Sequence, residues 1–208
     1  MTTSRKSRRS LLAGIAGLMG SVPLSVRAAT SVLTPQASEG QFYPQSSMRL
    51  PDIDNDLVQV AGLVEEAGGE IFTLRGRIMN DAGTPRVGHR IEIWQCDMDG
   101  NYMHPRDARS VNFDRAFQGF GHDITDETGG YVFRTIKPTI YPGRAPHIHV
   151  KLFDGDRELL TTQFYIKDDP NNIRDGLFAR MSEAEADAVS MVFVEGDHGP
   201  EATVDVVV

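Results

Sequence analysis

Two histidines stand at alternate positions in the segment YPGRAPHIHV, residues 141–150. Because alternate side chains of a β-strand share one face, we expect His147 and His149 on one face and Ile148 and Val150 on the other, toward a core. The two histidine Cα atoms would lie about 6.5 Å apart, which lets both imidazoles reach one metal ion. The H-x-H spacing alone also fits two polar residues on a solvated strand face.

Two neighbouring residues favour the metal site. Tyr141 precedes the histidines, and a tyrosinate is a hard anionic oxygen donor that suits a trivalent ion better than Zn²⁺ or Cu⁺. Arg144, in the intervening turn, could lower the pKa of a nearby phenol or hold an anionic substrate. No Asp or Glu directly flanks the histidines, and we interpret the single cysteine, Cys96, as a small buried hydrophobe. A site built from His and Tyr indicates ferric iron.

The elements that must position these residues are short strands. Residues 97–129 are polar, carry no clear period and are expected to form a long functional loop. One helix is expected at 181–190. The sequence therefore predicts a mainly β fold, a β-sandwich core with long active-site loops and little helix. Alternating apolar residues between Gly- and Asp-rich turns predict strands at 71–80, 89–95, 129–136, 147–155, 157–166, 191–196 and 202–208.

The N-terminus has the layout of a targeting segment. Residues 1–28 begin with basic residues, continue through an apolar run and end in small residues, which is typical of a cleaved signal peptide. The stretch SRRSLLAG resembles a twin-arginine signal, which would export the folded chain to the periplasm. A generic signal, or one retained as an anchor, is the alternative. After it we expect an extended arm at 29–70 and the β-sandwich domain at 71–208.

The charge of the chain argues against nucleic acid as a partner. The formal net charge is −8, and beyond residue 28 the chain has 16 basic against 29 acidic residues. An acidic surface disfavours binding to nucleic acid and to anionic membranes. The N-terminal apolar run is short and weakly apolar for a membrane span, so we expect no stable membrane insertion once the signal is removed.

Several motifs together resemble the intradiol ring-cleavage dioxygenases, the family of the protocatechuate and catechol dioxygenases. The resemblance extends from about residue 40 to residue 166 and includes EGQFYP, DIDNDLVQVAG, GRIMNDAGTPRVGHRIEIWQCDMDGNYMH, FQGFGHDITDETGGYVFRTIKPTIYPGRAPHIHV and LLTTQFYI. The last three of these motifs, taken together in this order, are highly specific.

The resemblance implies a non-haem Fe(III) ion held by two tyrosines and two histidines. Arg144 matches the active-site arginine of the family, and Gln163 matches a glutamine near the metal. Carried onto this sequence, the four ligands are Tyr102, Tyr141, His147 and His149.

Two further residues are candidates for the substrate pocket. Tyr43, in the arm, matches a segment that helps wall the active site in relatives. His122 stands where many relatives carry an arginine, and the alternative for it is a structural loop histidine, as we expect for His104 and His198. The ring substituents of the substrate stay open: catechol, protocatechuate, hydroxyquinol or a larger aryl diol.

The implied reaction opens a catechol between its two hydroxyl-bearing carbons and yields a cis,cis-muconate-type diacid that contains both atoms of O₂. The catechol would chelate the iron as a dianion and displace Tyr141, and either the released Tyr141 or hydroxide displaced from the iron can take a substrate proton. Arg144 would stabilise the developing negative charge. The expected partners are therefore a small aromatic diol and O₂ and, because relatives commonly form oligomers, further copies of the chain.

Two rival hypotheses come from other functional classes. The first is an exported β-sandwich that binds iron or catechols without turnover. The second is a structural, transthyretin-like sandwich in which the histidines are incidental. A full set of four ligands argues against the second rival, and the presence of Arg144 and Gln163 argues against the first.

Overall fold

The computed structural model describes residues 32–208, so the targeting segment expected at 1–28 lies outside the described residues. Residues 32–70 contain one short 3₁₀ helix, η1 (Ser46–Met48), and β1 begins at Ile71. In this described part of the chain the strands are β1 (Ile71–Met79), β2 (Arg90–Trp94), β3 (Phe120–Ile124), β4 (Gly130–Ile136), β5 (His147–Asp154), β6 (Arg157–Ile166), β7 (Ser190–Gly196), β8 (Gly199–Thr203) and β9 (Val206–Val207).

Helix is a minor part of the described chain. The helix expected at 181–190 is observed as α1 (Glu183–Ala188). It begins after Ser182, whose side chain accepts a hydrogen bond from the Glu185 N–H while the Glu185 carboxylate accepts one from the Ser182 N–H. This reciprocal pair satisfies two N–H groups that have no partner within the helix. The remaining 3₁₀ helices are η2 (Ser110–Asn112), η3 (Asn172–Arg174) and η4 (Phe178–Arg180).

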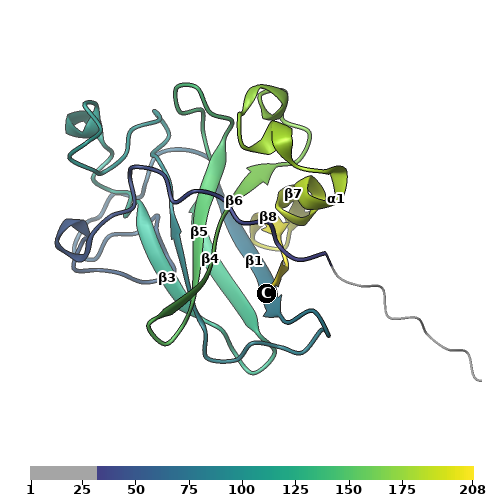
Figure 1. Cartoon of the computed structure of the whole chain (residues 1–208). Helices are drawn as coiled ribbons and strands as arrows, with labels where there is room; N and C mark the ends of the chain where they lie inside the picture. The colour runs from purple at the N-terminus through teal and green to yellow at the C-terminus, as the bar shows by residue number, and fades with distance from the viewer. Residues whose placement is uncertain (1–31) are drawn as a thin grey trace, which may run out of the picture.

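The strands form one continuous sheet in the order β3-β2-β5-β6-β7-β8-β1-β4, with β9 beside β1. The sheet folds over on itself, so that its two halves bury apolar side chains in one shared core (Figure 1). Ile93 of β2 and Val150 of β5 belong to the same core as Leu74 of β1 and Phe133 of β4. The prediction of a mainly β, sandwich-like fold with little helix is confirmed.

Strand β5 is buried on both faces. The expected alternation is observed, because Ile148, Val150 and Leu152 belong to the shared core. His147 and His149 lie on the opposite face and are buried as well. The alternative of two polar residues on a solvated strand face is therefore wrong.

Strand β3 is the element that the sequence pattern missed, since it lies within the stretch 97–129 that was expected to be a loop. Only its first and last residues, Phe120 and Ile124, are large and apolar, so it shows no alternation. It forms by pairing along the whole of β2, from Trp94 opposite Phe120 to Arg90 opposite Ile124. The long loop therefore ends before residue 120.

Strands β3 and β4 are the two ends of the sheet, and the arm closes the gap between them. The N–H of His122 in β3 donates to the Asp54 carbonyl at 3.0 Å. The N–H of Arg134 in β4 donates to the Asn55 carbonyl, and the Leu57 N–H donates to the Arg134 carbonyl, both at 2.8 Å. Covering exposed strand edges in this way prevents them from pairing with other chains.

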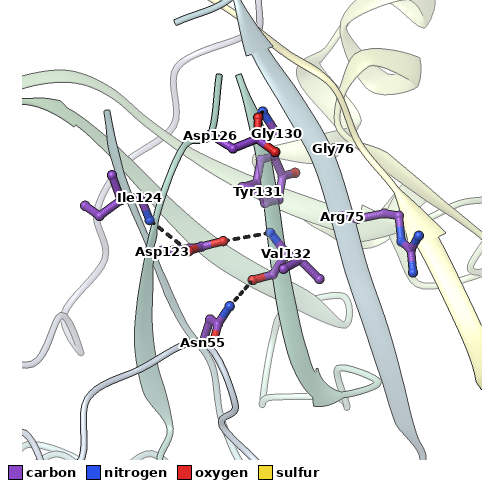
Figure 2. Close-up of a pocket in the computed structure, with 9 residues that line it drawn as sticks. All are labelled: Asn55, Arg75, Gly76, Asp123, Ile124, Asp126, Gly130, Tyr131 and Val132. Carbon is purple, nitrogen blue, oxygen red and sulfur yellow. Dashed lines mark hydrogen bonds between the residues drawn. The ribbon is translucent and has the colours of Figure 1, made fainter. Parts of the chain in front are cut away.

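A pocket of about 550 Å³ lies along this gap (Figure 2). Its polar groups are already paired: the Asp123 carboxylate accepts from the Val132 N–H at 2.8 Å, and Asn55 donates to the Val132 carbonyl at 3.1 Å. The Asp126 carboxylate accepts from the backbone of Thr128 and Gly130. This pocket therefore belongs to the closure of the sheet.

The arm also crosses β6, as the purple segment of Figure 1 shows. The Ala37 N–H donates to the Thr161 carbonyl at 2.8 Å, and the Gln163 side chain donates to the Ser38 carbonyl at 3.1 Å. This path brings the residues after Ser38 next to His149 of β5. Among residues 32–208, no helix is long and apolar enough to cross a membrane.

The close approach of another backbone segment to Gly76, in the middle of β1, allows a test of the fold. A Cβ atom at this position would lie 1.8 Å from the Val204 carbonyl oxygen, which also accepts a 2.7 Å hydrogen bond from the Tyr131 hydroxyl. We expect Gly76→Ala to lower the free energy of unfolding by about 3 kcal/mol, because the backbone must move apart. Urea unfolding followed by circular dichroism measures the change.

The matched control is Gly176→Ala. A Cβ atom at Gly176 would meet nothing within 4 Å, and the backbone there needs no positive φ. Its unfolding free energy should stay within about 0.5 kcal/mol of the parent value. Equal stabilities for the two variants would contradict the close approach at Gly76.

Candidate metal centre

The four metal ligands proposed from the sequence, and the arginine beside them, meet at one pocket of about 350 Å³. Both histidines and both tyrosines of the proposed ligand set line it, together with Arg144. The arm supplies one wall and the turn before β5 another. The lining residues are Gly40, Gln41, Phe42, Tyr102, Tyr141, Pro142, Arg144, His147 and His149.

The two imidazoles converge through their Nε2 atoms, which lie 3.1 Å apart. The Nδ1–H of His147 donates to the Ala145 carbonyl at 2.7 Å, which leaves the Nε2 lone pair of this ring facing the neighbouring histidine. Two nitrogen ligands about 2.1 Å from one metal ion lie about 3 Å apart when they meet it at a right angle. The observed separation therefore fits two ligands of a single ion.

Burial keeps both rings neutral. It lowers the pKa of His147 to about 4, with a further contribution from the positive charge of Arg144. Burial also lowers the pKa of His149 well below its usual range, and His147 and Arg144 act in the same direction. Neutral imidazole is the form that binds metals, so the rings need not lose a proton first.

The ring of His149 is held between two covering groups. The indole of Trp94 stacks on it with the ring centroids 4.6 Å apart and nearly parallel. On another side the backbone of Gly40 comes so close that a Cβ atom there would lie 3.2 Å from Cε1 of the imidazole. Trp94 is itself buried, so its indole restricts the orientation of this ring.

Tyr102 is the more enclosed of the two tyrosines. Its backbone N–H donates to the buried Asp107 carboxylate at 2.8 Å, and its ring stacks on Phe42 with centroids 4.6 Å apart. The hydroxyl is buried and has no hydrogen-bond partner among the described residues. Burial raises the pKa of Tyr102 well above its usual range, and the charge of Arg144 offsets part of this. A cation in the pocket would provide the partner that this oxygen lacks.

Tyr141 lies nearer the solvent, in the turn before β5. Its ring meets that of Tyr102 edge to face at 5.3 Å, and the guanidinium of Arg109 lies 5.0 Å from its centroid. Burial raises the pKa of Tyr141, while Arg109 lowers it. Within residues 32–208 no three His, Cys, Asp or Glu side chains are grouped to hold a metal. The two imidazoles and two phenols are thus the candidate donor set at this pocket, and anionic oxygen donors would favour a hard trivalent ion.

Comparisons with known proteins show the family to which the chain belongs. The sequence model of a family described as Dioxygenase matches residues 41–207. The protocatechuate 3,4-dioxygenase beta chain of Burkholderia cepacia is 36% identical over 146 residues, which cover 66% of this chain and 62% of the relative. The chain belongs to the intradiol ring-cleavage dioxygenase family.

Two further relatives extend the match. The catechol 1,2-dioxygenase of Candida albicans is 28% identical over 198 residues, covering 86% of this chain and 62% of the relative. The structure of a dioxygenase domain from a dioxygenase–carbohydrate-binding protein fusion of Streptomyces sp. SirexAA-E superposes with a TM-score of 0.64 at 31% identity. That match covers 85% of this chain and 98% of the solved one. The chain covers 62% of the length of each of the two curated relatives, the Burkholderia cepacia and the Candida albicans enzymes.

Several hydrogen-bond acceptors hold the guanidinium of Arg144, and the sequence identified only some of them. Gln163 was expected near the metal, and its carbonyl oxygen accepts a 2.6 Å hydrogen bond from Nη2 of Arg144. The Tyr165 hydroxyl lies 3.1 Å from the same nitrogen, and the Asp175 carboxylate accepts from Nε at 2.8 Å. Sequence reasoning missed both Tyr165 and Asp175. Tyr165 lies in the motif LLTTQFYI but was interpreted only as part of a strand, and Asp175 belongs to no motif and to no periodic pattern.

The two residues proposed for the substrate pocket do not line it. The Tyr43 hydroxyl donates to the Glu92 carboxylate at 2.7 Å, and its ring packs against Trp94. His122 lies on β3 opposite Glu92. The arm instead contributes Phe42, the neighbour of Tyr43, to the pocket wall.

The remaining side chains singled out from the sequence are two histidines and the cysteine, and none of them lines the pocket of about 350 Å³. His104 is buried, and its Nδ1 accepts a hydrogen bond from the Arg106 N–H at 3.1 Å. His198 is exposed in the turn between β7 and β8. Burial raises the pKa of Cys96 to about 11, so the side chain is a thiol and packs as a small hydrophobe, as expected.

The close approach of Gly40 to His149 gives a test of the site. Gly40 has φ +79°, and an added methyl group would press on the imidazole. We expect Gly40→Ala to lower the free energy of unfolding by about 1 kcal/mol through backbone strain and to lower the metal content, because the ring must shift. Metal analysis by mass spectrometry and urea unfolding measure the two effects.

Gly83→Ala is the matched control, since Gly83 has the same φ of +79° with nothing within 4 Å of an added Cβ. It should lose similar stability and keep its full metal content. If both variants kept or lost metal equally, the arm would not constrain the ring of His149.

Proposed function

We propose that this chain is a non-haem Fe(III) intradiol dioxygenase. It opens the ring of a catechol-type substrate between the two hydroxyl-bearing carbons, uses O₂, and forms a cis,cis-muconate-type diacid. The observation that carries the proposal is the meeting of two imidazole nitrogens, 3.1 Å apart, with two phenols and a guanidinium around one pocket. Membership of the intradiol dioxygenase family supports it.

The donor set fits ferric iron, which Tyr102, Tyr141, His147 and His149 would hold. Ferric iron, when bound, would draw electron density from a coordinated catechol and make its ring susceptible to O₂. Tyr102, His147 and His149 are buried and closely packed, so they serve as the ligands with fixed positions.

Tyr141 is the residue that accepts a proton from the substrate. Its phenol is less enclosed than that of Tyr102, and it lines the pocket where the substrate hydroxyl groups enter. As a phenolate, its oxygen can take a proton from a substrate hydroxyl, which makes it a general base as well as a ligand. Phe42 and Pro142 cover this part of the pocket with apolar surface and limit access of water.

Arg144 stabilises negative charge. Three acceptors engage its Nε and Nη2 atoms. Among the described residues no hydrogen bond engages Nη1, so this group can donate to an anionic substrate in the pocket. A preorganised cation in a site with little water lowers the energy of a charged transition state by several kcal/mol.

The volume of the pocket favours a small substrate. At about 350 Å³ it is near the lower end of the range for ligand sites and suits a single aromatic ring. We further propose that the chain is exported by the twin-arginine route to the periplasm and that it forms homo-oligomers. The first rests on the sequence of residues 1–28. The second extends to copies of this chain the assembly of several chains that the name of one relative, a beta chain, implies.

Colour is the first test of this function. The purified protein should contain iron and show a red to burgundy charge-transfer band, and Tyr102→Phe should weaken or abolish that band. Tyr131→Phe is the control, because Tyr131 is equally buried but bonds to Val204 away from the pocket. With a catechol, the parent protein should consume one O₂ per substrate and yield a diacid that absorbs in the ultraviolet.

The outcomes separate the rival functions. A colourless protein that contains zinc or no metal would refute the iron site. A shift of the band on addition of catechol without air, followed by no oxygen uptake when air is admitted, would indicate a binding protein without turnover.

Replacement of Arg144 tests the role of the guanidinium. We expect Arg144→Ala to lower kcat about 100-fold while iron content and the charge-transfer band stay near parent values, because this side chain is not a ligand. Arg180→Ala, which removes an exposed arginine of η4, should leave kcat within about twofold of the parent. Parallel losses of iron and kcat in Arg144→Ala would show that Arg144 instead maintains the metal site.

A further inference from the structure

The carboxylate of Asp175 is the most heavily hydrogen-bonded group beside the pocket. Its side chain is 0% exposed. One oxygen, Oδ2, accepts from Nε of Arg144 at 2.8 Å and from the Ala145 N–H at 2.9 Å. The other, Oδ1, accepts from Nη2 of Arg144 at 3.3 Å and from the N–H groups of Leu177 and Phe178 at 2.9 and 3.2 Å.

These contacts determine the plane of the guanidinium. Asp175 binds its Nε edge side-on, and Gln163 and Tyr165 hold Nη2 from the neighbouring strand. An arginine side chain has several rotatable bonds, and 24% of this one is exposed, so without these acceptors it could turn toward solvent. The carboxylate is the only charged member of the three described acceptors, and it alone receives two hydrogen bonds from the guanidinium, from Nε and from Nη2.

The same carboxylate connects Arg144 to the ligand segment. The Ala145 N–H donates to Asp175, and the Ala145 carbonyl accepts the Nδ1–H of His147. The buried carboxylate of Asp175 therefore holds the guanidinium in a defined position relative to the backbone that carries His147. We propose that Asp175 is a positioning residue, which holds Arg144 in the orientation that serves an anionic substrate in the pocket. This inference rests on the proposed function, since it assigns Asp175 a role in the same reaction.

The rival explanation is that Asp175 only stabilises the loop before η4, through Leu177 and Phe178. A double-mutant cycle separates the two, because a positioning residue acts through Arg144 and a structural residue does not. Asp175→Asn preserves the size of the side chain and removes its charge. We expect it to lower kcat about 30-fold, with KM for catechol changed by less than about threefold and with parent iron content and charge-transfer band.

In the Arg144→Ala background the same substitution should lower kcat by less than about threefold further. Asp169→Asn is the matched control, because the Asp169 carboxylate lies in the same segment but, within residues 32–208, accepts hydrogen bonds only from Asn171. It should keep kcat within about twofold of the parent. Equal losses from Asp175→Asn in both backgrounds, or a kcat within twofold of the parent, would overturn the proposal.

Two further measurements cover the remaining outcomes. Should Asp175→Asn lose iron or folded yield, Asp175→Glu displaces the carboxylate while keeping its charge. A kcat at least about tenfold lower with iron retained then supports positioning, and an unchanged kcat overturns it. Should the parent protein fail to turn over any catechol, the proposed function fails by itself. Crystal structures of the parent and Asp175→Asn then decide the positioning role, because the guanidinium must leave the pocket wall in the variant, and an unmoved guanidinium refutes it.

Discussion

The burial of polar groups that find no partner in the protein is the constraint on which this site depends. The Tyr102 hydroxyl has no partner among the described residues, and a buried polar atom left unpaired costs about 1–3 kcal/mol. The facing Nε2 atoms of His147 and His149 can form at most one hydrogen bond with each other. A cation would satisfy the phenol and both nitrogens together. The chain therefore carries a local cost that the rest of the fold must hold in place, which is typical of functional sites.

The arm supplies much of that restraint. It is tied to the sheet by ionic contacts close to the pocket: Lys151 of β5, almost fully buried, pairs with Glu39 of the arm and with Glu158 of β6. The hydroxyl of Tyr43 donates to the buried carboxylate of Glu92 on β2. Between these two anchors the chain passes the pocket at Phe42. A segment without regular secondary structure thus forms a wall of the site, held by side-chain contacts to the sheet, and Tyr43 contributes by anchoring it.

The sequence was sufficient where local geometry decides. Strand parity placed His147 and His149 on the face opposite the core, and the family motifs identified Tyr102 and Tyr141, which the structure brings to the same pocket. It was insufficient where a group is defined by distant partners. Strand β3 has few apolar residues and forms only because β2 lies beside it. Asp175 lies 31 positions after the arginine that it holds, in a loop whose composition is ordinary.

The unequal burial of the two phenols gives them different mobilities. Tyr102 stacks on Phe42 and its backbone is bonded to Asp107, so moving its ring would disturb both the arm and the loop. Tyr141 is partly exposed, and its turn is closed by a 2.9 Å hydrogen bond from the Arg144 N–H to the Tyr141 carbonyl. Because this bond ties the backbone of the turn, a rotation of the Tyr141 side chain need not move the backbone of Arg144. In the reaction proposed above, a substrate would then displace this phenol without loosening the group that stabilises its charge.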